Sequence, residues 1–249
     1  MAGVTFDFNA TFGDDYLYFH EAYLTEERSN AETAEIVELL NLAPGTRVLD
    51  APCGHGRIAN RLATAGMEVV GVDNNPGFLD LARADAAWRG VDVDLRWGDL
   101  RGLPVDGPFD AVLCWFTSFG YFEDDDNRRV LAEFHRVLRP EGRLLIETLH
   151  HDGFVRHFTT DPDATVTERG DDVMIDRSEF DPETGRVETT RVVHRDGVRR
   201  RSTHFIRLPT IPEWRQWLGE AGFEAARFTD SGGMLLTVDS WRLVVTALA

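Results

Sequence analysis

The residues with the clearest chemistry lie around Asp50, which ends a short apolar run and precedes Gly54 by four residues. The run reads as a strand, which is followed by a loop with Gly54 and Gly56 and then by a helix from Ile58. This arrangement would bring backbone N–H groups and a helix N-terminus up to a ligand. A carboxylate at the entrance of such a loop can hold a cationic amino group, whereas it would repel a pyrophosphate. The stretch therefore predicts a small-molecule site for a ligand with a positive charge.

Two further acids, Asp73 and Asp99, end the next two predicted strands, at residues 68–73 and 91–97. Asp73 follows Gly54 by nineteen residues, a spacing at which an acid reaches the hydroxyls of a ribose. The carboxyl ends of parallel strands meet at one edge of a sheet, so the three acids should converge there. Together they indicate a ligand site more strongly than any one of them does.

A competing interpretation starts from the same glycines, because Gly54-x-Gly56-x-x-Ala59 also fits the dinucleotide fingerprint. It would make the protein an NAD-dependent oxidoreductase. Asp50 and Asp99 stand against this interpretation, as does the lack of an identifiable hydride-transfer set. A third hypothesis is a regulatory module that binds a cofactor without turnover.

The apolar periodicity predicts strands that alternate with helices between residues 47 and 149, which is typical of a doubly wound α/β fold with a mostly parallel sheet. The strands are expected at 47–49, 68–73, 91–97, 109–115 and 143–149, and the helices at about 58–65, 77–89 and 125–138. A helix at 209–222 and strands at 223–228 and 241–248 would complete a seven-stranded sheet.

Two segments differ from this pattern. Residues 164–208 alternate polar and apolar side chains between three turn signals, which predicts an inserted antiparallel β-meander. Residues 1–41 are aromatic and acidic and predict an N-terminal helical lid, with a helix at about 29–41 capped by Ser29 or Asn30. The expected domains are the lid at 1–41, a catalytic domain at 42–163 and 209–249, and the meander at 164–208.

The chain resembles the class I S-adenosylmethionine-dependent methyltransferases over about residues 30–150. Three features carry this resemblance: the run Asp50-x-x-Cys53-Gly54-x-Gly56, the acids at the strand ends, and the run Leu138-x-Pro140-x-Gly142. The chain departs from the usual loop at Pro52, where the family has glycine. The resemblance implies a Rossmann-like methyltransferase fold with S-adenosylmethionine as cofactor. It implies that the cofactor is bound by Tyr18, Arg28, Asp50, Ala51, Cys53, Gly54, Gly56, Asp73, Asn74, Asp99, Leu100 and Trp115.

The methyl acceptor is expected beside the unusually aromatic stretch 116–122, which follows a central strand. Phe116, Phe119 and Tyr121 are the predicted contacts there, with His204 reaching in from the meander. His150 and His151 follow another strand and are candidate general bases, of which at most one should reach the pocket. No metal site is expected, because no third ligand stands at a suitable spacing.

Composition narrows the class of partner. The formal charge is −17, and all 26 basic residues are arginine, which argues against nucleic acid and anionic membranes. No run of apolar residues is long enough to span a membrane, and no signal peptide is evident, so we predict a cytoplasmic protein. The sequence thus predicts methyl transfer to an O, N or C atom of a small organic acceptor, such as a natural-product intermediate. A homodimer through the meander is a further expectation.

Overall fold

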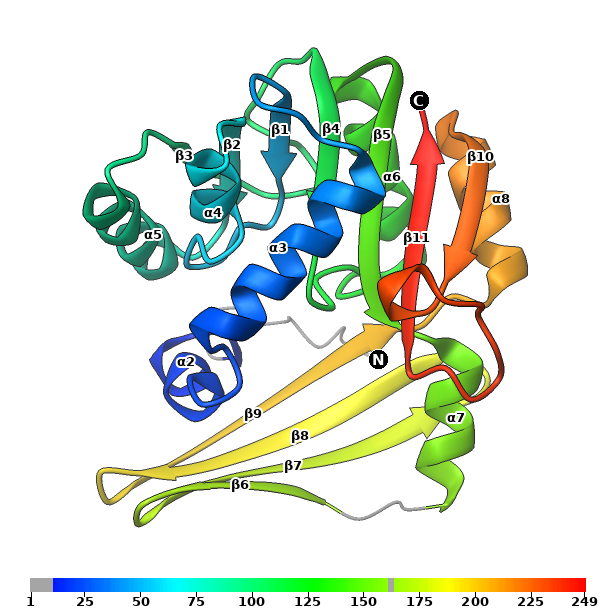
Figure 1. Cartoon of the computed structure of the whole chain (residues 1–249). Coiled ribbons are helices and arrows are strands. Elements are labelled where there is room, and N and C mark those ends of the chain that lie inside the picture. Colours follow the sequence, from blue (N-terminus) through cyan, green and yellow to red (C-terminus); the bar gives the residue numbers. More distant parts are fainter. Residues whose placement is uncertain (1–10, 161–163) are drawn as a thin grey trace.

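A computed structural model describes residues 11–160 and 164–249 and places a seven-stranded sheet at the centre of the protein (Figure 1). The strand order is β10-β11-β5-β4-β1-β2-β3, and β11 runs antiparallel to its neighbours. The strands are β1 (Arg47–Asp50), β2 (Glu68–Asp73), β3 (Asp94–Trp97), β4 (Phe109–Cys114), β5 (Leu138–Leu149), β10 (Glu224–Thr229) and β11 (Arg242–Leu248). The predicted doubly wound sheet, with its antiparallel last strand, is confirmed.

Strand β1 lies in the middle of this sheet because Val48 and Leu49 are completely buried and pair with strands on both sides. Asp50 ends the strand opposite Gly71 of β2 and Leu113 of β4. The first acid of the predicted site is therefore fixed at the centre of the carboxyl edge of the sheet.

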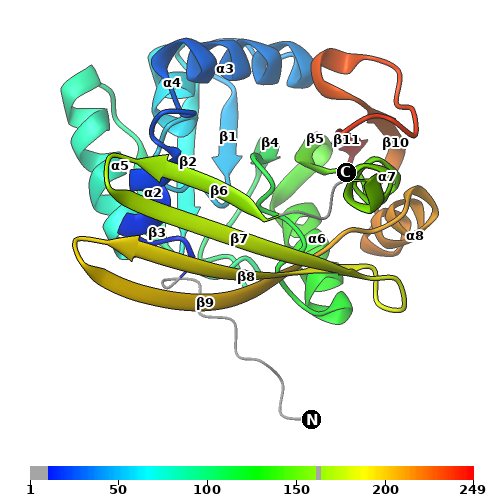
Figure 2. The same ribbon diagram turned by 90° about the horizontal axis from the view of Figure 1, so that it is seen from below.

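Helices cover both faces of the sheet (Figures 1 and 2). They are α3 (Glu26–Leu40), α4 (Ala59–Thr64), α5 (Pro76–Arg89), α6 (Asp124–Val137) and α8 (Ile211–Ala221). One core layer contains Phe134 of α6 and Trp214 of α8, and a second contains Ile36 of α3 and Leu62 of α4. The apolar periods that predicted these helices thus correspond to buried faces.

The N-terminal segment forms the expected helices, α2 (Asp14–His20) and α3, while residues 1–10 of the predicted lid lie outside the described residues. The predicted cap of α3 is wrong. The helix begins one turn earlier, and the Thr25 hydroxyl accepts the N–H of Arg28 at 3.2 Å. Ser29 is therefore a buried position inside the helix.

The predicted meander is a separate four-stranded antiparallel sheet in the order β6-β7-β8-β9. Its strands are β6 (Thr165–Arg169), β7 (Asp172–Asp181), β8 (Arg186–Arg195) and β9 (Val198–Arg207). A helix that the sequence did not predict, α7 (His151–Thr160), connects β5 to it. The meander crosses the carboxyl edge of the main sheet (Figure 1), and apolar contacts such as Val187 with Phe154 and Val193 with Phe19 fasten it there.

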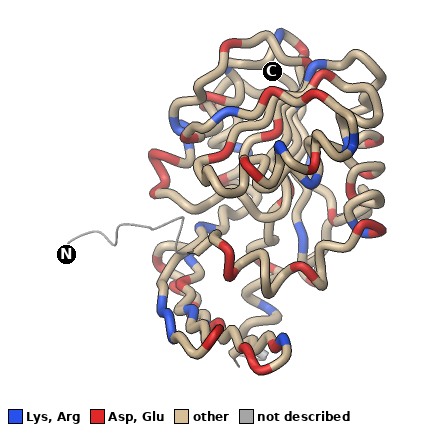
Figure 3. The backbone as a smooth tube through the Cα atoms, turned by 90° about the vertical axis from the view of Figure 1, so that its left-hand side faces the viewer, with Lys and Arg blue, Asp and Glu red and all other residues tan. Residues whose placement is uncertain are grey.

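Acidic and basic residues are interspersed along the chain on the side of the molecule that Figure 3 shows. Many arginines of the described chain pair with carboxylates, as Arg61 does with Glu26 at 2.6 Å and Arg139 with Asp110 at 2.7 Å. Within the described ranges, no helix is long and apolar enough to cross a membrane.

Candidate functional site

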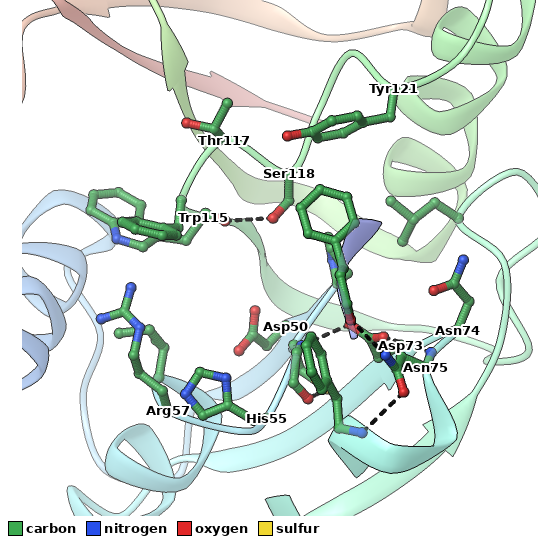
Figure 4. A pocket seen from close by; sticks show the side chains of 18 of the residues that line it. Asp50, His55, Arg57, Asp73, Asn74, Asn75, Trp115, Thr117, Ser118 and Tyr121 are labelled. Carbon is green, nitrogen blue, oxygen red and sulfur yellow. Dashed lines mark hydrogen bonds between the residues drawn. The ribbon is translucent and has the colours of Figure 1, made fainter. Parts of the chain in front are cut away.

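A cavity of about 1060 Å³, including solvent at its mouth, lies where the loops after β1, β2, β3 and β4 meet the N-terminal segment. Asp50, Asp73 and Asn75 form one wall, and Thr117, Ser118 and Tyr121 lie opposite (Figure 4). The lining residues are Phe12, Tyr16, Leu24, Asp50, Pro52, Cys53, Gly54, His55, Arg57, Ile58, Asp73, Asn74, Asn75, Phe78, Gly98, Asp99, Leu100, Trp115, Phe116, Thr117, Ser118, Tyr121 and Phe122.

Asp50 is the most strongly perturbed acid of this cavity. Its side chain is almost completely buried, and burial raises its pKa to about 8 despite the opposing charge of Arg57. The neighbouring carboxylate of Asp73 raises it further. A buried carboxyl of this kind ionises readily only when a cation arrives beside it.

Asp73 ties the glycine loop to the end of β2. Its two carboxylate oxygens accept the backbone N–H groups of Gly54 and Asn75, both at 2.8 Å. Burial raises the pKa of Asp73, and these backbone donors oppose that effect. The remaining lone pairs of the carboxylate can accept hydrogen bonds from ligand hydroxyls.

The two loop glycines have different roles. Gly54 lines the cavity, and a Cβ there would come no closer than 4.0 Å to Phe78. Gly56 faces helix α5 instead, where a Cβ would come within 2.7 Å of the Ala82 Cβ and 3.0 Å of the Ala82 Cα. Gly56 is therefore needed for close packing of the loop on α5, and it does not line the predicted cofactor cavity.

Replacing Gly56 by alanine is expected to destabilise the protein much more than replacing Gly90. Both glycines have positive φ, which costs an alanine about 1 kcal/mol, but a Cβ at Gly90 meets nothing within 4 Å. The overlap at Ala82 should add about 1–3 kcal/mol at Gly56 only. Urea unfolding of the two variants measures the difference, and equal losses of stability would contradict the packing role.

The remaining predicted cofactor residues divide between the cavity wall and its support. Asn74, Asp99, Leu100, Cys53 and Trp115 line the cavity, whereas Ala51 is buried behind it. Arg101 holds the pKa of Asp99 below its usual value, and the two side chains form an ion pair at 2.7 Å. The indole N–H of Trp115 donates to Glu32 at 3.2 Å.

Two predicted cofactor contacts of the N-terminal segment, Tyr18 and Arg28, do not line the cavity. Tyr18 points away from the cavity and donates its hydroxyl to Asp172 of the meander at 2.8 Å, while Tyr16 lines the cavity. Arg28 is 45% exposed and pairs with Glu32, while Arg57 is buried, lines the cavity and pairs with the same carboxylate at 2.5 Å. Sequence reasoning missed Tyr16, Arg57 and also His55, whose pKa is lowered to about 4 by burial and by Arg57.

Neither candidate base lies in the cavity wall. The chain leaves β5 at Leu149, and the buried ring of His150 packs against the Ser240 carbonyl oxygen, with Nδ1 at 3.1 Å. His151 begins α7 and pairs with Asp152 at 2.7 Å. The expectation that at most one of the two would reach the pocket assumed a continuing strand, whereas α7 begins at His151 and neither histidine lines the cavity.

Two predicted acceptor contacts also lie elsewhere. Phe119 is buried in the main core against Trp214, with ring centroids 4.8 Å apart, while Phe116 and Tyr121 do line the cavity. His204 lies on β9 opposite Thr189, which is buried on the inner face of the meander. Burial and the charge of Arg191 lower the pKa of His204 to about 4, so its imidazole is neutral.

These features fit S-adenosylmethionine, the cofactor that the sequence predicts. The buried carboxyl of Asp50 suits a cationic ligand, Asp73 offers acceptors for ribose hydroxyls, and Gly54 leaves room for a close approach. A dinucleotide would place its pyrophosphate against two buried acids, which is unfavourable. Among the described residues, no group of three or more His, Cys, Asp or Glu side chains could hold a metal ion.

Comparison with known sequences points in the same direction. Residues 48–142 match the family model described as "Methyltransferase domain". The chain is 34% identical over 138 residues to a glycine/sarcosine N-methyltransferase of Halorhodospira halochloris, covering 53% of this chain and 50% of that protein. It is 30% identical over 190 residues to a Geobacillus protein (strain WCH70) named "Putative methyltransferase", covering 74% of this chain and 76% of that protein. The chain thus spans about half the length of the first of these relatives and about three quarters of the second.

Comparison with solved structures gives the same fold. One similar structure is S-adenosylmethionine-bound CalS10, an amino pentose methyltransferase of Micromonospora echinaspora involved in calicheamicin biosynthesis. The TM-score is 0.68 at 21% sequence identity, and the match covers 99% of each chain.

Proposed function

The chain belongs to the class I S-adenosylmethionine-dependent methyltransferases, and from this premise we propose that it methylates a small organic molecule. The observation that carries the proposal is the place of Asp50. Its buried carboxyl faces the same cavity as Asp73 and Asp99, opposite a wall of aromatic rings. A cationic cofactor on one wall and an acceptor against the other would use both sides of this cavity.

The protein needs only to bind the cofactor and the acceptor and to hold them in the orientation for methyl transfer. S-adenosylmethionine supplies a methyl group that its sulfonium has already activated. Asp50, Asp73 and the Gly54 loop would hold the cofactor on its side of the cavity. Trp115 and Phe116 on one side and Phe12 and Tyr16 of the lid on the other would exclude water and restrict the acceptor to an in-line approach.

The acceptor would lie between the 115–122 loop and the lid. Phe116 and Tyr121 remain the proposed contacts, and the relatives named above act on glycine, sarcosine and an amino pentose. A small metabolite or natural-product intermediate fits this setting. Both cysteines of the chain are buried free thiols, which supports the cytoplasmic location that we propose.

Calorimetric titration with S-adenosylmethionine, S-adenosylhomocysteine and NAD tests the proposal. We expect the first two to bind and NAD not to bind. An acceptor screen, read by the mass gain of one methyl group, then tests turnover. Binding of NAD alone would favour the oxidoreductase, whereas cofactor binding without any methylated product across the screen would favour the regulatory module.

A further inference from the structure

Glu147 is a buried carboxylate near the end of β5 with one oxygen that the protein leaves unused. Its side chain is 8% exposed, and its other oxygen, Oε1, accepts from the Nε of Arg242 on β11. No donor of the described residues meets the geometry of a hydrogen bond to Oε2, although the backbone N–H of Phe116 lies close enough to lower the pKa of the carboxyl group. A buried carboxylate oxygen without a donor is costly and marks a place where a ligand can supply one.

This carboxylate lies directly behind the cavity wall. The N–H of Thr117 donates to the backbone oxygen of Glu147 at 3.0 Å, and Arg242 donates to the Thr117 hydroxyl at 2.6 Å. Thr117 and its neighbour Phe116 both line the cavity. Both have left-handed backbones, with φ values of 57° and 62°, although neither is glycine. Strained pairs of this kind gather at ligand clamps.

The cavity in front of Thr117 also contains a cluster of aromatic rings. Phe12 lies edge-on to Tyr16 at 5.3 Å and to Tyr121 at 5.2 Å between ring centroids, and all three line the cavity. Burial raises the pKa of both tyrosines. Tyr121 lies on the same side of the cavity as Thr117 (Figure 4), whose hydroxyl Arg242 contacts. Aromatic faces attract organic cations, and a carboxylate beside them adds a hydrogen-bond acceptor.

Other charged groups near this end of the cavity are already paired. Asp176 uses both oxygens on Arg191, at 2.8 and 2.7 Å, and Glu32 is shared by Arg28 and Arg57. Burial and the charge of Glu32 both raise the pKa of Glu147, while Arg242 lowers it. Apart from Asp50, which the proposed function assigns to the cofactor, Glu147 Oε2 is therefore the carboxylate oxygen that remains for a substrate donor.

We propose that the methyl acceptor is an amine, whose N–H group donates to Glu147 Oε2 beside the Phe12, Tyr16 and Tyr121 rings. This inference rests on the proposed function and adds the substrate class to it. Glu147 would select an amine over an alcohol of the same shape, because a primary amine offers two N–H donors where an alcohol offers one O–H donor. In the transfer, the neutral amine nitrogen forms the new N–CH3 bond as the sulfonium S–CH3 bond breaks, S-adenosylhomocysteine leaves, and Glu147 accepts the proton that the resulting ammonium loses.

Matched pairs of probes test this selection. Glucosamine is compared with glucose, and ethanolamine with ethylene glycol, by calorimetry on the S-adenosylhomocysteine complex and by mass gain with S-adenosylmethionine. Binding and methylation of at least one amine, with no response to its hydroxyl partner, is expected. Equal binding of both members of each pair, or of neither, would overturn the amine assignment, provided that S-adenosylhomocysteine itself binds. Failure of S-adenosylhomocysteine to bind would instead overturn the proposed function.

The variant Glu147→Gln should weaken amine binding about tenfold or more, since a hydrogen bond to a charged group is lost. Its affinity for S-adenosylhomocysteine should remain within about twofold of wild type, which also reports correct folding. Glu188→Gln, at an exposed position of β8, is the control and should leave both affinities unchanged. If Glu147→Gln alone unfolds, Glu147→Gln with Arg242→Gln removes both charges of the pair and should lose the same preference. Full amine preference in a folded Glu147 variant would contradict the assignment.

Discussion

Replacing Asp50 by asparagine is expected to abolish detectable binding of S-adenosylmethionine while making the ligand-free protein more stable at alkaline pH. The first effect follows because asparagine keeps the shape of the side chain but cannot neutralise a cationic ligand. The second follows from the raised pKa of Asp50, about 8 in the folded protein, compared with about 3.9 in an unfolded chain.

The sign of this pH effect is fixed by proton binding. Between the two pKa values the folded protein keeps a proton on Asp50 that the unfolded chain has lost, so wild-type stability falls as the pH rises through this window. The asparagine side chain does not titrate, so the advantage of the variant should grow from about pH 4 to about pH 8, up to a few kcal/mol.

Urea unfolding of wild type and Asp50→Asn at about pH 5 and about pH 9 measures this advantage, and calorimetry measures cofactor binding. Asp92→Asn, at an exposed position before β3, is the matched control and should change neither quantity. Wild-type cofactor affinity in Asp50→Asn would remove Asp50 from the site. An advantage that shrinks with rising pH would contradict the buried, protonated carboxyl.

Replacing Asp73 by alanine should have the second large effect, because this side chain both shapes the loop and faces the ligand. The variant leaves the N–H groups of Gly54 and Asn75 without their acceptors, at a cost of about 1–3 kcal/mol for each group that remains buried. Affinity for S-adenosylmethionine should fall about 100-fold or more through the lost ligand contacts and the displaced loop.

Asp73→Asn separates the two contributions, since its single carbonyl oxygen can still accept one of the two N–H groups. Its stability should lie between those of wild type and Asp73→Ala. Calorimetry and thermal unfolding of the three proteins provide the comparison. Alanine and asparagine variants with wild-type affinity would show that Asp73 does not contact the cofactor.

The sequence predicted best where structure follows from local periodicity. The alternation of strands and helices gave the doubly wound sheet, and the turn signals of residues 164–208 gave the meander within one or two residues. The three acids could be found because the end of an apolar strand is a local feature, and parallel strands bring such ends together. Asp50, Asp73 and Asp99 accordingly line one cavity.

The sequence predicted poorly where function depends on the rotation or the end of an element. Tyr16 and Tyr18 point about 200° apart around the short helix α2, and only its packing on the meander decides which of them faces the cavity. His150 looked like a base at a strand end, but the turn into α7 directs its ring against the Ser240 carbonyl.

The sequence by itself therefore determined the fold, the family resemblance and the acidic wall of the site, because each depends on residue type and short-range spacing. Tertiary structure alone decided that Arg57 lines the cavity in place of Arg28, that Gly56 serves packing, and that Glu147 lies behind Thr117 with an unused oxygen. These features join segments far apart in the chain, and no local pattern records which side chains will meet when those segments pack together.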